Sequence, residues 1–217
     1  MNGKILAPSI LGHNSCRIVD GIAIAEKFHA PWVHVDVMDG MFVQNIAGGQ
    51  CVVRDMCALT RLTLDVHLMV QSPERLVESF ADAGADALTV HAEATEDPVK
   101  ISKLIERRGC MAGIAINPDT PVAAIEKIID WFDIILLMGV HPGKCGQKFL
   151  VPVYEKIRAL LALREVRRLS YKISVDGGIN AETLPLANDA GADIFVSGSS
   201  FFTNPEGISK IFRSVGN

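Results

Sequence analysis

The sequence has no long hydrophobic run, no surplus of basic residues and no linker or low-complexity segment. Its most apolar stretch, residues 128–140, contains Asp130 and Asp133 and is shorter than the ~18 apolar residues that indicate a membrane span. A net charge of −4 lacks the basic footprint of a nucleic-acid-binding protein. The first residues, MNGKILAPSIL, have one lysine and no apolar core typical of a secretory signal. We therefore expect a cytoplasmic protein that binds neither membranes nor nucleic acids.

Paired cysteines of the kind that bind metals or form redox centres are also missing. The five cysteines are odd in number and form no CxxC motif, which favours buried free thiols in a reducing compartment. One of them, Cys145, differs because glycines surround it. The others are Cys16, Cys51, Cys57 and Cys110.

The 217 residues have the composition of one globular domain, with 49% apolar and 21% charged residues. Short β-branched runs alternate with helix-like segments, of which 73–84, 97–109 and 180–192 begin with proline or a capping residue and end near glycine. Eight such alternations predict an α/β protein, a single (β/α)8 TIM barrel over residues 1–217, with a doubly wound open sheet as the alternative. The expected strands are residues 4–10, 32–38, 62–69, 87–91, 112–117, 133–140, 172–177 and 193–199.

Polar side chains and methionines gather near the ends of these expected strands, the edge where barrel enzymes carry their active sites. In the second strand, VHVDVM, valines alternate with a histidine, an aspartate and a methionine, so the latter three share one face. The third strand, DVHLM, repeats the pattern, and an aspartate ends the seventh. The residues at this edge are Ser9, His34, Asp36, Met38, Asp65, His67, Met69, Met138 and Asp176.

Each of these residues has an ordinary structural explanation when taken singly. A histidine on an apolar strand is usually a satisfied core residue, Asp39-Gly40 is ordinary turn chemistry, and lone methionines fill cores. Two histidines and two aspartates at one rim are different, because burying several such groups without a partner is costly. Imidazoles and carboxylates together are a normal donor set for a first-row divalent metal, so their convergence favours a metal site.

Three glycine-bearing loops follow the last three expected strands: 141–149, 176–180 and 197–200. Loops at these positions of a barrel commonly bind phosphate through glycine backbone amides and the start of a short helix. A single glycine pair is weak support, but three consecutive loops favour a phosphate site beside the metal site.

Eight short motifs, in order from about residue 5 to 200, resemble the ribulose-phosphate 3-epimerase family. They are APSIL, VHVDVMDG, LDVHLM, VHAEA, INPDTPV, PGxxGQKF, VDGGIN and SGSS. The resemblance implies a (β/α)8 barrel and an isomerase of carbohydrate metabolism that epimerises C3 of a ketose phosphate. The expected reaction converts D-ribulose 5-phosphate to D-xylulose 5-phosphate, a step of pentose phosphate metabolism.

The resemblance also implies roles for individual residues of the barrel mouth. Asp36 would be the proton acceptor and Asp176 the proton donor. One divalent ion per chain (Zn, Fe, Mn or Co) would be held by His34, Asp36, His67 and Asp176. Substrate would contact Ser9, His67, Gly143, Lys144, Cys145, Gly146, Gly177, Gly178, Gly198 and Ser199. Met38, Met69 and Met138 would form a water-poor pocket floor.

The expected chemistry explains why these residue types are needed. The proton to be removed lies alpha to a ketone and is a poor acid, so a Lewis-acid metal would stabilise the enediolate. Inversion requires proton removal on one face of the carbon and delivery on the other, which two carboxylates on opposite sides can perform.

The loops over the mouth depart from the family pattern. Met41 and Gln44 stand where the family commonly has His and Pro, IAGGQ stands where a Gly-Pro pair is common, and HPGKCGQ replaces NPGFGGQ. GHNS also stands where Ser-x-Asp is usual. These departures leave the identity of the substrate open. For Lys144 and Lys148, the alternative to a phosphate-binding role is a charge that is simply exposed to solvent.

Three alternatives therefore remain open. The nearest is 3-epimerisation of a ketohexose 6-phosphate such as D-allulose 6-phosphate. A barrel that performs decarboxylation or aldol chemistry would usually need a strand lysine at the rim, and Lys172 lies four residues before Asp176, too deep in the barrel. The last is a non-catalytic barrel that binds a sugar phosphate. In each case we expect a small-molecule sugar phosphate as ligand and a homo-oligomer.

Overall fold

The computed structural model describes residues 3–144 and 146–215. Nine strands and eight α-helices occur in these residues. The strands are β1 (Ile5–Pro8), β2 (Trp32–Asp39), β3 (Ile46–Ala47), β4 (Thr63–Met69), β5 (Ala87–His91), β6 (Met111–Ile116), β7 (Ile134–Met138), β8 (Lys172–Asp176) and β9 (Ile194–Ser197). The helices are α1 (Ile18–Lys27), α2 (Gln50–Leu59), α3 (Val77–Asp82), α4 (Pro98–Arg107), α5 (Val153–Arg167), α6 (Thr183–Ala190), α7 (Ser199–Thr203) and α8 (Pro205–Val215).

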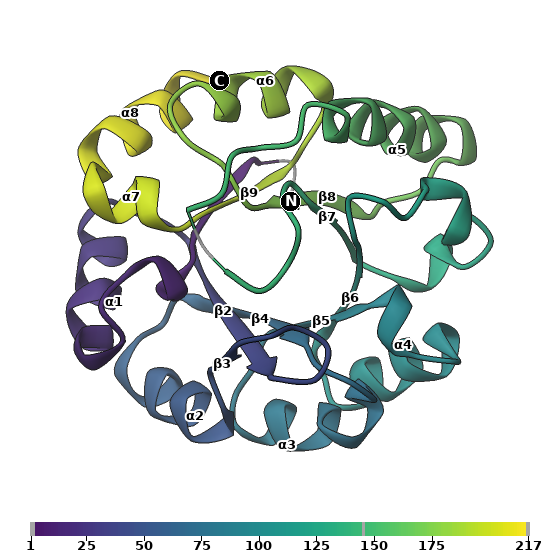
Figure 1. Ribbon diagram of the computed structural model, residues 1–217, viewed down its shortest axis with the longest axis horizontal. Coiled ribbons are helices and arrows are strands. Elements are labelled where there is room, and N and C mark those ends of the chain that lie inside the picture. Colours follow the sequence, from purple (N-terminus) through teal and green to yellow (C-terminus); the bar gives the residue numbers. More distant parts are fainter. Residues whose placement is uncertain (1–2, 145, 216–217) are drawn as a thin grey trace.

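Eight of the strands form a parallel sheet that curls into a barrel, with the helices in a ring around it (Figure 1). The strand order is β1-β9-β8-β7-β6-β5-β4-β2, and β3 pairs antiparallel with the end of β2. A parallel bridge between Ser9 and His34 joins β1 to β2 and closes the ring. The expected (β/α)8 barrel is confirmed, and the open doubly wound sheet is wrong.

All eight strands expected from the sequence are present, with bounds within two residues of those predicted. Strand β3 was missed because two residues are too few to show a side-chain period. Between β6 and β7 the expected helix is replaced by two short 3₁₀ segments, Val122–Ala124 and Ile129–Trp131. The remaining 3₁₀ segments are Ile10–Gly12, Ser15–Arg17, Pro73–Arg75 and Ala92–Ala94.

The start of α4 and the end of α6 lie where the sequence punctuation indicates. The side chain of Asp97 accepts a hydrogen bond from the backbone N–H of Lys100 and caps α4. Gly191, with φ +112, ends α6 in the left-handed conformation that glycine adopts without strain. None of the helices within the described residues is both long enough and apolar enough to cross a membrane.

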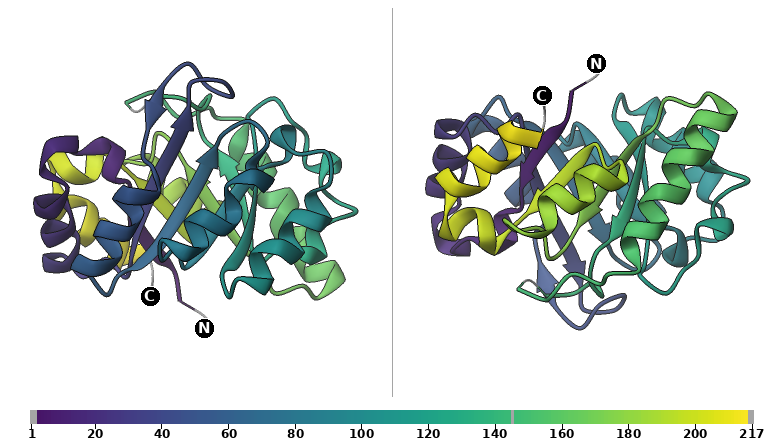
Figure 2. Two further views of the ribbon diagram at one scale, coloured as in Figure 1. Left: turned by 90° about the horizontal axis from the view of Figure 1, so that it is seen from below. Right: turned by 90° about the horizontal axis from the view of Figure 1, so that it is seen from above.

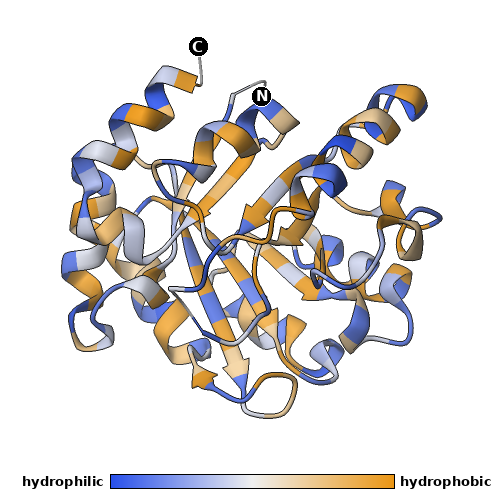
Figure 3. Cartoon of the chain, turned by 45° about the horizontal axis from the view of Figure 1, so that its top comes forward, coloured by the Kyte–Doolittle hydropathy of each residue, from blue (hydrophilic) through white to orange (hydrophobic). Residues whose placement is uncertain are grey.

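The alternating side chains of the strands build two packed layers. Val33, Val35 and Val37 of β2 belong to the large core between strands and helices, and burying such a side chain contributes roughly 1.5–3 kcal/mol. A second apolar layer, which includes Ala7, Trp32, Ala87, Ile134, Ile194 and Val196, fills the barrel interior. The strands are accordingly mostly hydrophobic in colour in Figure 3, while the helices show both colours. This inner layer therefore packs beneath the side chains at the carboxyl ends of the strands and supports them.

Two of the loops that depart from the family pattern lie at the same end of the barrel. Figure 2 shows the β2–β3 connection and the loop after β7 at one end, and the first and last described residues at the opposite end. The side chain of Asn45 donates a hydrogen bond to the backbone carbonyl of Gly143 (3.1 Å) and ties the two loops together. The open end of the barrel is thus flanked by two mutually bonded loops.

The expectation that the cysteines are buried thiols is wrong for three of them. Cys16, Cys51 and Cys57 are exposed, because they lie on outward faces of the surrounding helices and the Ser15–Arg17 turn. Cys110 is a buried free thiol, as expected, and its sulfur lies 3.1 Å from the carbonyl of Ala85. Cys145 lies outside the described residues.

Candidate active site

The strand register brings the histidines and aspartates of β2 and β4 next to each other. In the parallel ladder, His34 is opposite Asp65, Asp36 is opposite His67, and Met38 is opposite Met69. All six side chains are buried, and their alternation with valine and leucine turns them to the barrel interior. Asp176 ends β8, a strand in another part of the ring (Figure 1).

Four side chains from three strands meet in one compact cluster: His34, Asp36, His67 and Asp176. The Nε2 atom of His34 lies 3.5 Å from Asp36 Oδ1 and 3.9 Å from Asp176 Oδ2. The Nδ1 atom of His67 lies 3.4 Å and 3.7 Å from the same two oxygens. Four ligands about 2.1 Å from one ion in a tetrahedral arrangement are roughly 3.4 Å apart. The spacing therefore suits a shared divalent ion.

The unpaired nitrogens of the cluster support the same interpretation. Within the part of the chain that the structure describes, His34 Nε2 and His67 Nδ1 are buried and have no hydrogen-bond partner. A buried polar atom without a partner costs about 1–3 kcal/mol, so such atoms are rare unless a ligand satisfies them. Both atoms point into the cluster, toward the two aspartates. The residues present thus fit a metal ion, whose identity the donor set does not fix.

Neighbouring groups hold the four side chains in place. Asp65 Oδ2 lies 2.7 Å from His34 Nδ1, and Ser9 Oγ donates a 2.6 Å hydrogen bond to Asp36 Oδ2. His91 Nε2 lies 2.9 Å from His67 Nε2. The sequence pattern placed Asp65 on the correct face without giving it a role. It did not single out His91, although the VHAEA segment contains it.

The buried cluster shifts the pKa values of the two aspartates in opposite directions. Burial disfavours the charged form of Asp36, but the proximity of His34 and His67 outweighs it and holds the pKa of Asp36 well below its usual range. Burial and the negative charge of Asp36 raise the pKa of Asp176 to about 7. Burial lowers the pKa of His67. For His34, burial is opposed by Asp65 and Asp36, which raise its pKa well above the usual value.

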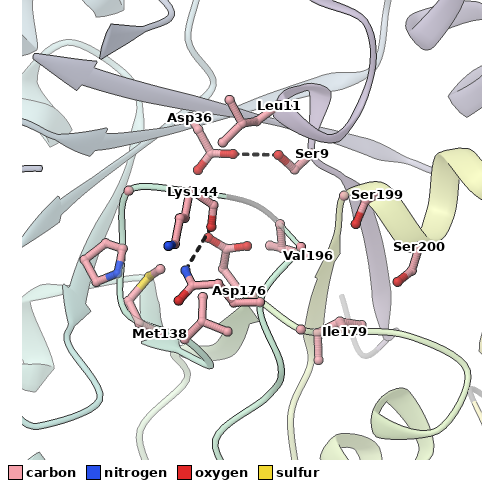
Figure 4. A pocket seen from close by; sticks show the side chains of 18 of the residues that line it. Ser9, Leu11, Asp36, Met138, Lys144, Asp176, Ile179, Val196, Ser199 and Ser200 are labelled. Carbon is pink, nitrogen blue, oxygen red and sulfur yellow. Dashed lines mark hydrogen bonds between the residues drawn. The ribbon is translucent and has the colours of Figure 1, made fainter. Parts of the chain in front are cut away.

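A cavity of about 260 Å³ opens directly above the cluster. Asp36 and Asp176 line it from opposite sides and point toward each other, and Ser9 lies beside Asp36 (Figure 4). Three methionines from different strands, Met38, Met69 and Met138, contribute apolar surface. The cavity thus joins two carboxylates to a partly apolar chamber of small-molecule size.

The loops after β7, β8 and β9 supply much of the remaining wall. Of the residues expected to bind substrate, Ser9, Gly143, Lys144, Gly146, Gly177, Gly178, Gly198 and Ser199 line the cavity. His67 is fully buried and lies behind the lining, and Cys145 lies outside the described residues. The lining also includes Gln147, Lys148, Asn180 and Ser200. The sequence alone gave none of them a role in binding, and left open whether the charge of Lys148 serves phosphate or only faces solvent.

Glycine is required by the local geometry at Gly178 of the lining and at Gly12, which does not belong to it. Gly178 has φ +71, and a Cβ there would lie 2.6 Å from the backbone nitrogen of Phe149, so any other residue would be strained and would clash. Near the start of α7, a Cβ on Gly12 would lie 2.3 Å from backbone atoms of Gly198 and Ser199. The backbone of these loops therefore comes close to the cavity without side chains in between.

The substituted mouth residues differ in their relation to the cavity. Lys144 lines it (Figure 4), whereas Met41 and Gln44 are exposed and do not belong to its lining. The side chain of Asp39 accepts hydrogen bonds from the backbone N–H groups of Met41, Phe42 and Gln71, which fixes the start of the loop. A difference at position 144 can therefore act on a bound ligand directly.

Fold and site together define a class of protein: a (β/α)8-barrel enzyme with a buried two-histidine, two-aspartate centre beneath a small cavity. Residues 5–202 match the model of the ribulose-phosphate 3 epimerase family. The chain belongs to this family, whose members are isomerases acting on sugar phosphates.

Curated relatives cover nearly the whole chain. The ribulose-phosphate 3-epimerase of Treponema pallidum is 46% identical over 198 residues, which are 91% of each chain. That of Bacillus subtilis is 43% identical over 198 residues, also 91% of each chain. That of Mycobacterium bovis is 41% identical over 200 residues, 92% of this chain and 86% of the relative. The family match over residues 5–202 includes every described strand and the loops that line the cavity.

More distant solved structures share the fold alone. KGPDC from Streptococcus mutans superposes with a TM-score of 0.71 at 16% identity, covering 99% of this chain and 97% of the other. A chain of the tryptophan synthase complex of Pyrococcus furiosus gives a TM-score of 0.65 at 15% identity, covering 99% and 98%. Both likenesses agree with a barrel fold over nearly the whole chain.

Proposed function

We propose that this protein is a metal-dependent 3-epimerase of a ketose phosphate that interconverts D-ribulose 5-phosphate and D-xylulose 5-phosphate. The observation that carries the proposal is the placement of Asp36 and Asp176, which face each other across one cavity above a buried histidine pair. Relatives at 41–46% identity bear the name of this activity. An assay over a panel of ketopentose and ketohexose phosphates tests it, and failure to epimerise any of them would contradict it.

The reaction needs stabilisation of negative charge and two proton-transfer groups. A divalent ion held by His34, Asp36, His67 and Asp176 would supply Lewis-acid stabilisation of charge on the sugar oxygens, worth several kcal/mol. Ser9 donates to Asp36 Oδ2 and so orients that carboxylate. The methionines of the lining restrict water around the reactive carbon.

The two aspartates are placed for opposite roles in the proton transfers. Both carboxylates line the cavity, so one can accept the C3 proton while the other donates a proton to the opposite face. In the reverse direction the roles exchange. Since the groups lie on opposite sides of the cavity, the sugar need not turn over between the two transfers.

The phosphate of the substrate would bind at the loops after β7, β8 and β9. The support is the exposure of Gly177, Gly178, Gly198 and Ser199 to the cavity, where their backbone amides are close to any ligand. The nearby side chains of Lys144 and Lys148 add positive charge. The part of the cavity formed by these loops lies beside the carboxylates of Asp36 and Asp176, so a phosphate bound there would place the sugar over the two carboxylates.

Removal of the phosphate group from the substrate should lower kcat/KM strongly. Losing two hydrogen bonds to a charged group costs roughly 3–6 kcal/mol, which corresponds to about 10²–10⁴-fold. Part of the loss should be in kcat, because remote binding energy also supports the transition state. Steady-state kinetics with D-ribulose and D-ribulose 5-phosphate measure the ratio, and similar kcat/KM values would exclude a phosphate site.

Replacing Lys144 by the phenylalanine common in the family should change the preference between pentose and hexose phosphates by roughly tenfold, or ~1.4 kcal/mol. The reason is that Lys144 lines the cavity. The matched control is the double substitution Met41→His and Gln44→Pro, which restores family residues outside the lining and should change the ratio less. Ratios of kcat/KM for the two substrates measure the effect. If neither variant changes the ratio, these differences do not select the substrate.

A further inference from the structure

A hydrogen-bonded chain that the proposed reaction does not use runs outward from His67. His67 Nε2 lies 2.9 Å from His91 Nε2, and His91 Nδ1 lies 3.2 Å from Glu93 Oε2. The two imidazole planes are inclined by 23° with ring centroids 5.0 Å apart, and both histidines are fully buried. In such an imidazole–imidazole hydrogen bond, one nitrogen must carry the proton and donate, and the other must be unprotonated and accept.

The direction of the chain is fixed at its outer end, by the groups around Glu93. The backbone N–H of Asn117 donates to Glu93 Oε1 (2.8 Å), and the hydroxyl of Thr120 donates to the same oxygen. Burial disfavours the charge of Glu93, but these contacts and His91 outweigh it and lower the pKa of Glu93 to about 2. The ionised carboxylate can only accept, so His91 Nδ1 must donate to it.

The proton position on His91 in turn determines the proton position on His67. With its proton on Nδ1, a neutral His91 has no proton on Nε2, and this nitrogen accepts a hydrogen bond from the N–H at His67 Nε2. His67 in turn has a bare Nδ1, the atom 3.4 Å from Asp36 and 3.7 Å from Asp176. We propose that Glu93 and His91 are positioning residues that fix the tautomer of His67 so that its Nδ1 lone pair points into the metal site. This inference rests on the metal site of the proposed function.

The second histidine of the cluster has an equivalent arrangement. His34 Nδ1 contacts Asp65 directly at 2.7 Å, and its Nε2 faces the cluster without a hydrogen-bond partner among the described residues. Glu93 therefore does for His67, through His91, what Asp65 does for His34. Carboxylates that orient ligating histidines in this way affect metal affinity by roughly 10–100-fold in metalloproteins.

The substitution Glu93→Gln should reverse the whole chain without a change of shape. The amide oxygen must remain at Asn117, because the backbone N–H there can only donate. The amide NH₂ then faces His91 Nδ1 and donates to it. His91 Nε2 becomes the protonated atom, His67 Nε2 becomes the acceptor, and the proton of His67 moves to Nδ1. A protonated Nδ1 cannot bind a cation.

Two measurements on purified full-length protein test the proposal. Nitrogen-15 NMR of the ion-free protein should show His67 protonated at Nε2 in the parent and at Nδ1 in Glu93→Gln. Competition with a chromophoric chelator should show Zn²⁺ affinity lower by roughly 10–100-fold in the variant. The control Thr120→Val removes one contact to Glu93 but leaves its acceptor character, so it should retain the parent tautomer and nearly the parent affinity.

A double-mutant cycle separates orientation from packing. His91→Phe interrupts the chain, so Glu93→Gln should have no further effect on Zn²⁺ affinity in that background. The proposal is overturned if the parent carries the His67 proton on Nδ1, if Glu93→Gln leaves the tautomer unchanged, or if the two substitutions are additive. Absence of epimerase activity on every sugar phosphate, with the expected tautomers and Zn²⁺ affinities, would instead contradict the proposed reaction and leave this inference standing.

Discussion

Removal of the divalent ion should reduce epimerisation by at least about 10³-fold, because Lewis-acid stabilisation of several kcal/mol is lost. We expect about one equivalent of a divalent ion per chain in the purified protein and recovery of activity when Zn²⁺, Fe²⁺, Mn²⁺ or Co²⁺ is returned. Elemental analysis together with a coupled assay measures both quantities. The expectation rests on four histidine–aspartate distances of 3.4–3.9 Å and on two buried nitrogens that lack a partner among the described residues.

The substitution His67→Ala tests the same centre without a chelator. It removes one of four ligands and should remove most of the bound metal. The matched control is His29→Asn, because His29 lies outside the cluster and has φ +60, a conformation that asparagine also adopts. The control should retain its metal and activity. A protein shown to be free of metal and still fully active would end the proposal of a metal-dependent reaction.

The inward-facing part of the site could be predicted from the sequence because strands have a strict period of two. The alternation in VHVDVM and DVHLM is enough to place His34, Asp36 and His67 on inward faces of their strands. The barrel rule that sites lie at strand ends then adds Asp176. What the pattern could not give is the register, in which Asp36 is opposite His67.

The surrounding network could not be predicted for a different physical reason. Whether His91 contacts His67, and whether Glu93 reaches both His91 and Asn117, depends on packing between β4, β5 and the loop after β6. No periodicity specifies such contacts. The exposed cysteines were predicted wrongly because the prediction used the average burial of cysteine in proteins. Cys51 lies on the outer face of α2 and is exposed.

The substitutions Asp36→Asn and Asp176→Asn should each lower epimerisation by roughly 10²–10⁴-fold or more, the usual contribution of a general acid or base. Inversion needs a working group on each face of C3, and the two carboxylates line opposite sides of the cavity. Asparagine is nearly isosteric, so the fold should be retained, but metal occupancy must be measured because both residues belong to the cluster.

The two variants should also differ from each other in a way that a one-base mechanism does not allow. With metal bound, each variant retains one carboxylate and can still exchange the C3 proton of one epimer without inverting the carbon. Proton NMR in heavy water, with each epimer and each variant, should therefore show deuterium uptake with opposite epimer preferences. If either variant with confirmed metal occupancy epimerises at close to the parent rate, Asp36 and Asp176 are not the acid–base pair.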